Sequence, residues 1–327
     1  MSCSIRSFAK INLGLKIGPA RADGFHELRT IYQTVALHDV VRVELQRGTG
    51  IEIRCDDPRV PVDESNTCHK IAERVMRTAE SRSRVIIEIE KRLPVQGGMG
   101  AASSNAVATI LGLEREIGKR LPAEDRLHLA AEVGSDLPLF LIGGTVLGVD
   151  RGQEVYPLRD LPTMHLVVVT PPIGVSTPQA FARWDALAAQ AALTGSGLAG
   201  RIKMFSETVY EWLNEGFSSQ AGPASGVPAT GGDRGETLLL DLVRAGIEND
   251  FERVVFPEYP ELCESKRVLQ REGALYASLS GSGSTLYGLF ASATEAKSAA
   301  ERMRTAGHAA VATRSLSRKE YWNALAG

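Results

Sequence analysis

The most constraining feature of the sequence is a run of small residues between a predicted strand and a predicted helix. Residues 85–89 (Val-Ile-Ile-Glu-Ile) have the composition of a strand, and residues 106–117 have the apolar spacing of a helix. Between them, residues 97–104 read Gly-Gly-Met-Gly-Ala-Ala-Ser-Ser. Small residues let the backbone approach a bulky ligand, and glycine adopts positive φ without strain. The stretch is therefore either a phosphate cradle or an ordinary strand-to-helix turn.

The residues around this loop exclude two common phosphate motifs. We expect Ser103 or Ser104 to cap the helix, whose first N–H groups would form an anion site. No Gly-Lys-Ser/Thr follows, so the loop is not a P-loop. Ser103 stands where a dinucleotide fingerprint needs its third glycine. A phosphate site here must therefore be of another type.

Length and composition limit the class of protein. The 327 residues are long for one core and predict two domains, and 43% apolar and 23% charged residues are ordinary for a globular protein. The formal net charge of −2 gives no electrostatic reason to expect nucleic acid or an anionic membrane as a partner. The four cysteines show no metal or disulfide spacing, and no apolar run is long enough to span a bilayer. We therefore expect a soluble protein of the reducing cytoplasm.

Three polar residues outside the loop lie where a cleft could use them. Lys10 and Asn12 are two apart in the predicted strand 5–17, so both side chains point to the same face. Asp136 follows a helix end and precedes a Leu-Pro pair, which favours extended backbone at Leu137. Its apolar flanks suit a general base. The plainer alternatives are a solvated strand face for the first two residues and an Asx turn for Asp136.

Further candidates lie on predicted loops and helix ends. The turn-forming residues before Phe25 and His26 predict that both lie on a loop. There they could stack on a flat heterocycle and hydrogen-bond to it. Equally, Phe25 could fill the core while His26 is solvated. Asn66 stands at the start of a predicted helix, where capping is the simpler role and ligand contact the alternative. A second glycine- and serine-rich loop, residues 280–284, joins two predicted strands, and two such loops suggest a shared ligand.

Three motifs, in this order, resemble those of the GHMP small-molecule kinases. They read Ala-Lys-Ile-Asn-Leu-Gly-Leu, Pro-Val-Gln-Gly-Gly-Met-Gly-Ala-Ala-Ser-Ser and Leu-Ser-Gly-Ser-Gly-Ser-Thr, at residues 9–15, 94–104 and 279–285. Three other stretches resemble the branch that acts on a polyol linked to cytidine diphosphate, and they lie at residues 21–28, 134–138 and 175–181. The resemblance covers nearly the whole chain.

The resemblance implies an α+β protein with the GHMP kinase two-domain fold. Residues 1–160 would form an N-terminal ATP-binding and catalytic domain, which is ribosomal-protein-S5-domain-2-like. Residues 161–327 would form a ferredoxin-like C-terminal domain, in which the composition of residues 218–235 predicts a mobile loop. The implied activity is ATP-dependent phosphorylation of a hydroxyl of the cytidine-diphosphate-linked polyol, with Mg²⁺ arriving on ATP. A homoserine- or mevalonate-type kinase and a non-catalytic nucleotide sensor are the alternatives.

The resemblance also implies roles for individual residues. Asp136 matches the catalytic aspartate, and Lys10 matches the lysine that polarises the attacked hydroxyl. The positions that match substrate contacts are Asn12, Phe25, His26, Thr177 and Phe181, with His26 at the cytosine. Those that match ATP contacts are Asn66 and Lys91 near the adenine and, around the triphosphate, Pro94, Gly97, Gly98, Met99, Gly100, Ala101, Ala102, Ser103 and Ser104. The third glycine loop contributes Gly281, Ser282 and Gly283.

Four residues depart from the family pattern. Phe25 stands where a tyrosine is common, Asn105 replaces a usual aspartate, and Ala101 and Ala102 replace glycines. Alanine tolerates positive φ poorly, so we expect either the path of the loop or its distance from the phosphate to differ at these two positions. None of the departures removes a catalytic group.

Overall fold

The computed structural model describes residues 3–95, 97–190, 195–218 and 247–325. Within these ranges helices and two separate sheets are combined, which confirms the α+β prediction. The loop predicted at residues 218–235 lies, apart from its first residue, outside the described ranges. No helix among the described residues is both long enough and apolar enough to cross a membrane.

The first sheet is built around one long strand. Its members are β1 (Cys3–Ala20), β2 (His26–Gln46), β3 (Ile51–Cys55), β4 (Arg84–Glu90), β5 (Thr145–Val149) and β6 (Glu154–Pro157). β2 pairs antiparallel with β1, β4 and β5, while β3 lies parallel to β4 at one edge. β2 is one continuous strand, although the polar residues His38 and Asp39 interrupt its apolar pattern. The sequence pattern placed His26 on a loop, whereas this residue begins β2.

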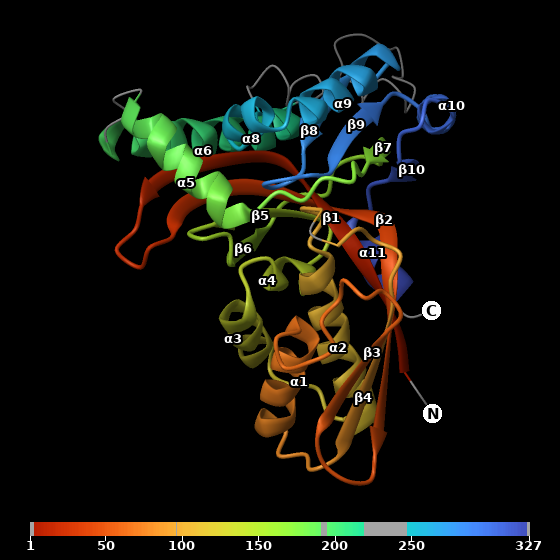
Figure 1. Ribbon diagram of the computed structural model, residues 1–327. Helices are drawn as coiled ribbons and strands as arrows, with labels where there is room; N and C mark the ends of the chain where they lie inside the picture. The colour runs from red at the N-terminus through yellow and green to blue at the C-terminus, as the bar shows by residue number, and fades with distance from the viewer. Residues whose placement is uncertain (1–2, 96, 191–194, 219–246, 326–327) are drawn as a thin grey trace.

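Helices cover the first sheet. α1 (Thr67–Thr78), α2 (Ala101–Ile117), α3 (Ala123–Val133) and α4 (Leu137–Phe140) lie together on one side of it (Figure 1). The final helix, α11 (Arg318–Leu325), returns to this part of the molecule. There Tyr321 donates to the Phe140 carbonyl over 2.7 Å, and its ring centroid lies 5.7 Å from that of Phe8. Helix α11 therefore packs into the same core as the first part of β1.

The second sheet has four antiparallel strands in the order β10-β7-β9-β8. The strands are β7 (His165–Val169), β8 (Tyr276–Leu279), β9 (Leu286–Phe290) and β10 (Ala310–Arg314). Its helices are α5 (Thr177–Gln190), α6 (Gly195–Ser218), α8 (Glu252–Glu258), α9 (Pro260–Arg271) and α10 (Ala293–Thr305). Tyr259 has φ −126° and ψ 76°, as expected before Pro260, and this separates α8 from α9.

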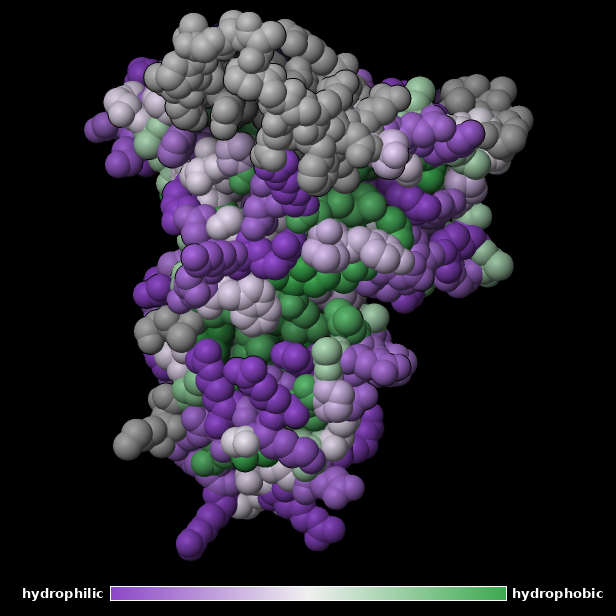
Figure 2. Space-filling model, turned by 180° about the vertical axis from the view of Figure 1, so that it is seen from behind, coloured by the Kyte–Doolittle hydropathy of each residue, from purple (hydrophilic) through white to green (hydrophobic). Residues whose placement is uncertain are grey.

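A shared apolar cluster joins the two sheets. Ala9, Ile11 and Leu13 of β1 are buried in one cluster with Val168 of β7 and Leu289 of β9. Figure 1 shows β1 and β2 running from the lower part of the molecule into the upper part. Seen from behind, hydrophobic residues gather at mid-height, above a more hydrophilic lower part (Figure 2). The strand that carries Lys10 therefore runs through the junction of the two sheets.

Candidate active site

The middle of β1 forms the centre of the candidate site. Lys10 Nζ donates to Asn12 Oδ1 over 2.7 Å and lies 3.2 Å from Asp136 Oδ2. Asn12 in turn donates to Thr30 Oγ1 over 2.7 Å, which fixes the orientation of its amide. Both Lys10 and Asn12 are buried, so the alternative of a solvated strand face is wrong. The strand alternation correctly placed them on one face.

Asp136 reaches this centre from the helix side. It is the N-cap residue of α4, yet its side chain makes no capping bond, so its carboxylate is not used by an Asx turn. The predicted extended backbone at Leu137 is wrong, because α4 begins there. Pro138 occupies the first turn, where the N–H that proline lacks would have had no helical partner. With 31% of its side chain exposed, Asp136 remains accessible to a ligand.

Tyr32 is a member of this group that the sequence reasoning missed. Its hydroxyl donates to Asp136 Oδ1 over 3.1 Å, and Lys10 Nζ lies 5.4 Å from its ring centroid. Burial and the neighbouring carboxylate raise the pKa of Tyr32 well above its ordinary value, so the hydroxyl stays protonated as a donor. The register of β1 on β2 pairs Tyr32 with Asn12. Only this register, which the sequence alone does not contain, places Tyr32 beside the centre of the site.

The first glycine loop leads into α2 one turn earlier than expected. Gly98 has φ 76° and Gly100 has φ 68°, and Gly100 is the N-cap residue. Capping by Ser103 or Ser104 is therefore wrong, since both lie inside the helix. Ser104 accepts a hydrogen bond from the Ser7 hydroxyl over 2.8 Å.

The two alanines of the loop region are ordinary helical residues. Ala101 and Ala102 both belong to the first turn of α2, and the positive φ angles fall on the glycines before them. Neither alanine therefore has to adopt positive φ. A Cβ atom at Gly100 would lie 3.2 Å from Lys10 Cε, so the N-terminus of α2 adjoins the lysine.

The two glycine-rich loops contact each other. Ser280 Oγ donates to the Gly98 carbonyl over 3.0 Å, and the Thr285 amide donates to the Gly97 carbonyl over 3.1 Å. A Cβ atom at Gly98 would lie 2.2 Å from the Ser280 carbonyl oxygen, so only glycine permits this approach. A Cβ atom at Gly281 would lie 3.6 Å from Lys10 Nζ. The two loops and the lysine are therefore adjacent, while the ligand that the two loops are expected to share stays a prediction.

Asn249 holds the 280–284 loop in place, and sequence reasoning missed it. Its Nδ2 donates to the Leu279 carbonyl over 2.8 Å and to the Gly281 carbonyl over 2.7 Å. On the other side of the loop, Ser282 Oγ lies 2.7 Å from Thr177 Oγ1 at the start of α5. No local pattern identifies Asn249, because both of its acceptors lie about 30 residues further along the chain.

The residues expected near the adenine have structural partners. Asn66 caps α1 by accepting from the Cys68 amide over 2.8 Å, which confirms the simpler role. Lys91 Nζ donates to Asp39 Oδ2 over 2.7 Å, and both side chains are buried. Asp39 also accepts from Asn105 Nδ2 over 3.1 Å. A carboxylate at position 105 would face that of Asp39, which explains why an amide is suitable here.

Other residues of the first loop pack closely against their neighbours. The Met99 side chain is buried in the core, and its carbonyl accepts from the Lys10 amide over 3.0 Å. A Cβ atom at Gly97 would lie 2.9 Å from Pro94 Cγ, so these two residues pack closely. At Met99, the backbone rather than the side chain shapes the site.

The predicted base-binding residues lie at the far end of β1 and β2. His26 and Phe181 stack with ring centroids 4.9 Å apart and an interplanar angle of 11°. His26 Nε2 is 2.7 Å from Asp185 Oδ1, a partner on α5 that sequence reasoning missed. Phe25 is 49% exposed, and the Arg151 guanidinium lies 4.8 Å from its ring centroid. The two alternatives for this pair, a filled core and a solvated imidazole, are therefore both wrong.

Two family descriptions match the chain. GHMP kinases N terminal domain matches residues 66–144, and GHMP kinases C terminal matches residues 236–309. The N-terminal match includes the first glycine loop and Asp136, and the C-terminal match includes the 280–284 loop.

Similar proteins extend the match over most of the chain. The 4-diphosphocytidyl-2-C-methyl-D-erythritol kinase of Solibacter usitatus is 37% identical over 88% of this chain and 80% of its own length. The enzyme of the same name from Synechococcus elongatus is 33% identical over 91% of this chain and 89% of its own. The enzyme of the same name from Acaryochloris marina is 32% identical over 93% of this chain and 92% of its own length.

Solved structures share the fold. A crystal structure of 4-(cytidine 5'-diphospho)-2C-methyl-D-erythritol kinase superposes with a TM-score of 0.70 at 27% identity, covering 95% of this chain and 98% of its own. L. major mevalonate kinase in complex with R-mevalonate has a TM-score of 0.66 at 17% identity, covering 96% of both chains. The second likeness shows the fold alone. Sequence and structure together show that this chain belongs to the 4-diphosphocytidyl-2-C-methyl-D-erythritol kinase family of the GHMP kinases.

Proposed function

We propose that this protein transfers the γ-phosphoryl group of ATP to the 2-hydroxyl of 4-diphosphocytidyl-2-C-methyl-D-erythritol. The products would be the 2-phosphate and ADP, in the non-mevalonate route to isopentenyl diphosphate. One observation carries the proposal at the level of the site. A lysine–aspartate pair lies where two glycine-rich loops meet, next to a helix N-terminus. Phosphoryl transfer needs positioning and charge stabilisation, and this arrangement supplies both.

Asp136 would take the proton of the attacked hydroxyl. Its Oδ2 faces Lys10 and its Oδ1 accepts from Tyr32, so the direction of the carboxylate is fixed from two sides. Its partial exposure leaves room for a substrate hydroxyl. Lys10 would polarise that hydroxyl and balance negative charge as the phosphoryl group moves.

The triphosphate would lie along the first glycine loop. Gly98 and Gly100 shape its turn, and Ser103 lies in the first turn of α2. Helix N-termini carry a partial positive charge that favours phosphate. The 280–284 loop, with Gly281 beside Lys10, would close over the same phosphates.

Mg²⁺ would reach the site on ATP. Among the described residues, no cluster of three or more metal-ligating His, Cys, Asp or Glu side chains exists. Mg²⁺ keeps several waters and is bound mainly by substrate phosphates together with one or two carboxylates. A site without a larger cluster of ligating side chains therefore fits an ion that is carried by the nucleotide. When bound, the ion would neutralise developing charge on the phosphate oxygens.

The cytidine end would be recognised at His26. The ring is stacked on Phe181 and bonded to Asp185, so it is held in one orientation. Phe25, Asn12 and Thr177 complete the proposed substrate contacts. All four cysteines are free thiols, which supports a reducing, cytoplasmic setting as part of the proposal.

A panel of acceptor alcohols tests this function. The purified protein is given ATP and Mg²⁺ with the cytidyl substrate, homoserine or mevalonate, and ADP release is measured. We expect turnover with the cytidyl substrate. Turnover with only homoserine or mevalonate would indicate another GHMP kinase, and ATP binding without turnover on any acceptor would indicate a nucleotide sensor.

A further inference from the structure

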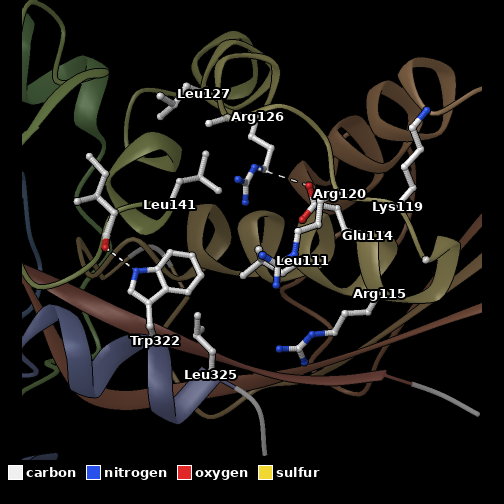
Figure 3. A pocket seen from close by; sticks show the side chains of 13 residues that line it. Leu111, Glu114, Arg115, Lys119, Arg120, Arg126, Leu127, Leu141, Trp322 and Leu325 are labelled. Atoms are coloured by element: carbon white, nitrogen blue, oxygen red, sulfur yellow. Dashed lines mark hydrogen bonds and ion pairs between the residues drawn. The ribbon is translucent and has the colours of Figure 1, made fainter.

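A pocket of about 650 Å³ lies at the opposite end of α2 from the glycine loop (Figure 3). It is enclosed by the C-terminal end of α2, the start of α3, the residues after α4, and α11. Its lining includes no residue of the Lys10 centre or of either glycine loop. None of the roles proposed for the active site uses this pocket.

The charged lining of the pocket is strongly basic. Four cations, Arg115, Lys119, Arg120 and Arg126, line it together with one carboxylate, Glu114. The chain as a whole has a formal net charge of −2, so this concentration of positive charge is local. Cationic clefts with low-dielectric walls concentrate anions.

The single carboxylate of the lining is already engaged. Glu114 is buried, and its Oε1 accepts from the Leu121 amide over 2.9 Å. Arg126 Nε forms an ion pair with the same oxygen at 3.7 Å, a distance too long for a hydrogen bond. Within the part of the chain that the structure describes, this buried Nε has no hydrogen-bond partner. Arg126 therefore has donor capacity that Glu114 does not use.

The opposite wall of the pocket is apolar. Trp322 and Leu325 of α11 face it together with Leu141, which follows α4. The indole is held in place because Trp322 Nε1 donates to the Ile142 carbonyl over 2.8 Å. Trp322 is nevertheless 37% exposed. A fixed, partly exposed indole beside guanidinium groups can stack on a flat apolar body.

We propose that this pocket binds a small organic anion, in which a phosphate, sulfonate or carboxylate is joined to an apolar, flat body. The anionic group would contact Arg120 and Arg126, and the apolar body would lie against Trp322 and Leu141. The ligand needs both an anionic group and an apolar body. Inorganic phosphate would contact only the basic wall, and a neutral aromatic compound only the apolar wall.

The fluorescent probe 8-anilinonaphthalene-1-sulfonate has this chemistry. Titrated into the full-length protein with saturating ATP, it should bind at one saturable site. Its neutral analogue N-phenyl-1-naphthylamine should bind much more weakly. Equal binding of the two compounds would show a plain apolar patch, and saturable sulfonate binding that is seen only when ATP is left out would place the probe in the ATP-binding site. Either result would overturn the proposal.

Charge-reversal variants locate the site. Arg120→Glu should weaken sulfonate binding about tenfold or more, because a charge-assisted contact becomes a repulsion. Arg47→Glu is the matched control, since this exposed arginine after β2 does not line the pocket. Both side chains are exposed, and unchanged ATP turnover would show that each variant is folded. Equal loss in both variants, or loss in neither, would contradict a site centred on Arg120.

Discussion

The two ends of the active site hold their charged groups in different ways. At the phosphoryl end, the Lys10 side chain is 4% exposed and is bound by residues of β1 and α4. At the base end, the Asp185 side chain that contacts His26 is 56% exposed. Exposed pairs are screened by water, whereas buried groups act through fixed geometry and a lower effective dielectric. The groups proposed for the chemistry therefore lie in the core, and part of the proposed base-recognition site lies nearer the surface.

Substitution at the phosphoryl end should have the largest effect. Asp136→Asn keeps the size of the side chain and removes its ability to take a proton. We expect kcat to fall about 100-fold or more while the KM for ATP stays nearly unchanged. Steady-state kinetics with varied ATP and varied cytidyl substrate measure both.

Asp56→Asn is a suitable control, because this aspartate is exposed after β3 and lies outside the site. It should leave both constants unchanged. An Asp136→Asn enzyme with the wild-type rate would remove Asp136 from the mechanism.

Local relations between residues could be predicted from the sequence, whereas contacts between distant parts of the chain could not. Lys10 and Asn12 were predictable because their relation is local, two residues apart on one strand. Tyr32 and Asn249 were not, because each bonds to a group far along the chain, Tyr32 to Asp136 and Asn249 to the Gly281 carbonyl. Such contacts depend on strand register and on how the two sheets meet, and a single sequence contains neither.

The errors also have local physical causes. The helix cap was assigned to Ser103 or Ser104 because their hydroxyls are good caps, but Gly100 reaches the left-handed conformation that starts α2 earlier. The strand at residues 85–89 and the helix at residues 106–117 were predicted correctly from composition and apolar spacing.

The next largest effect should come from the base end. His26→Ala removes both the stacking partner of Phe181 and a hydrogen-bonding group. We expect the KM for the cytidyl substrate to rise about 30-fold, which corresponds to the loss of one hydrogen bond and part of an aromatic contact. The KM for ATP should change little, as both Michaelis constants measured in parallel would show. A similar rise in both would place His26 outside the base site.

A smaller effect is expected from Tyr32→Phe, which tests whether the core positions Asp136. The variant keeps the ring beside Lys10 and loses only the donor to Asp136 Oδ1. We expect kcat to fall about tenfold with both KM values unchanged. An unchanged kcat would mean that Lys10 alone orients the carboxylate.

The same variant has a signature in alkaline solution. The pKa of Tyr32 is raised above its ordinary value of 10.0 by burial and by the Asp136 carboxylate. Because the folded pKa exceeds the unfolded one, the stability that this adds is complete below pH 10 and is lost as the pH rises through the folded pKa. The free energy of unfolding of Tyr32→Phe should therefore fall less above pH 10 than that of the wild type. Denaturant titrations at pH 8 and above pH 10 measure the difference, and equal slopes would contradict it.

The smallest effect should come from Asp185, the exposed partner of His26. Asp185→Ala removes a contact of 2.7 Å whose carboxylate is already largely in water, so little net free energy is lost. We expect the KM for the cytidyl substrate to rise about threefold, and kcat to stay unchanged. Asp185→Asn, which retains an acceptor oxygen, should behave more like the wild type. If Asp185→Ala matched His26→Ala in KM, the carboxylate would itself bind the base. If Asp185→Ala lowered kcat nearly as much as Asp136→Asn does, the exposed end would also contribute to the chemistry. The proposed separation of a buried chemical end from an exposed recognition end would then be wrong.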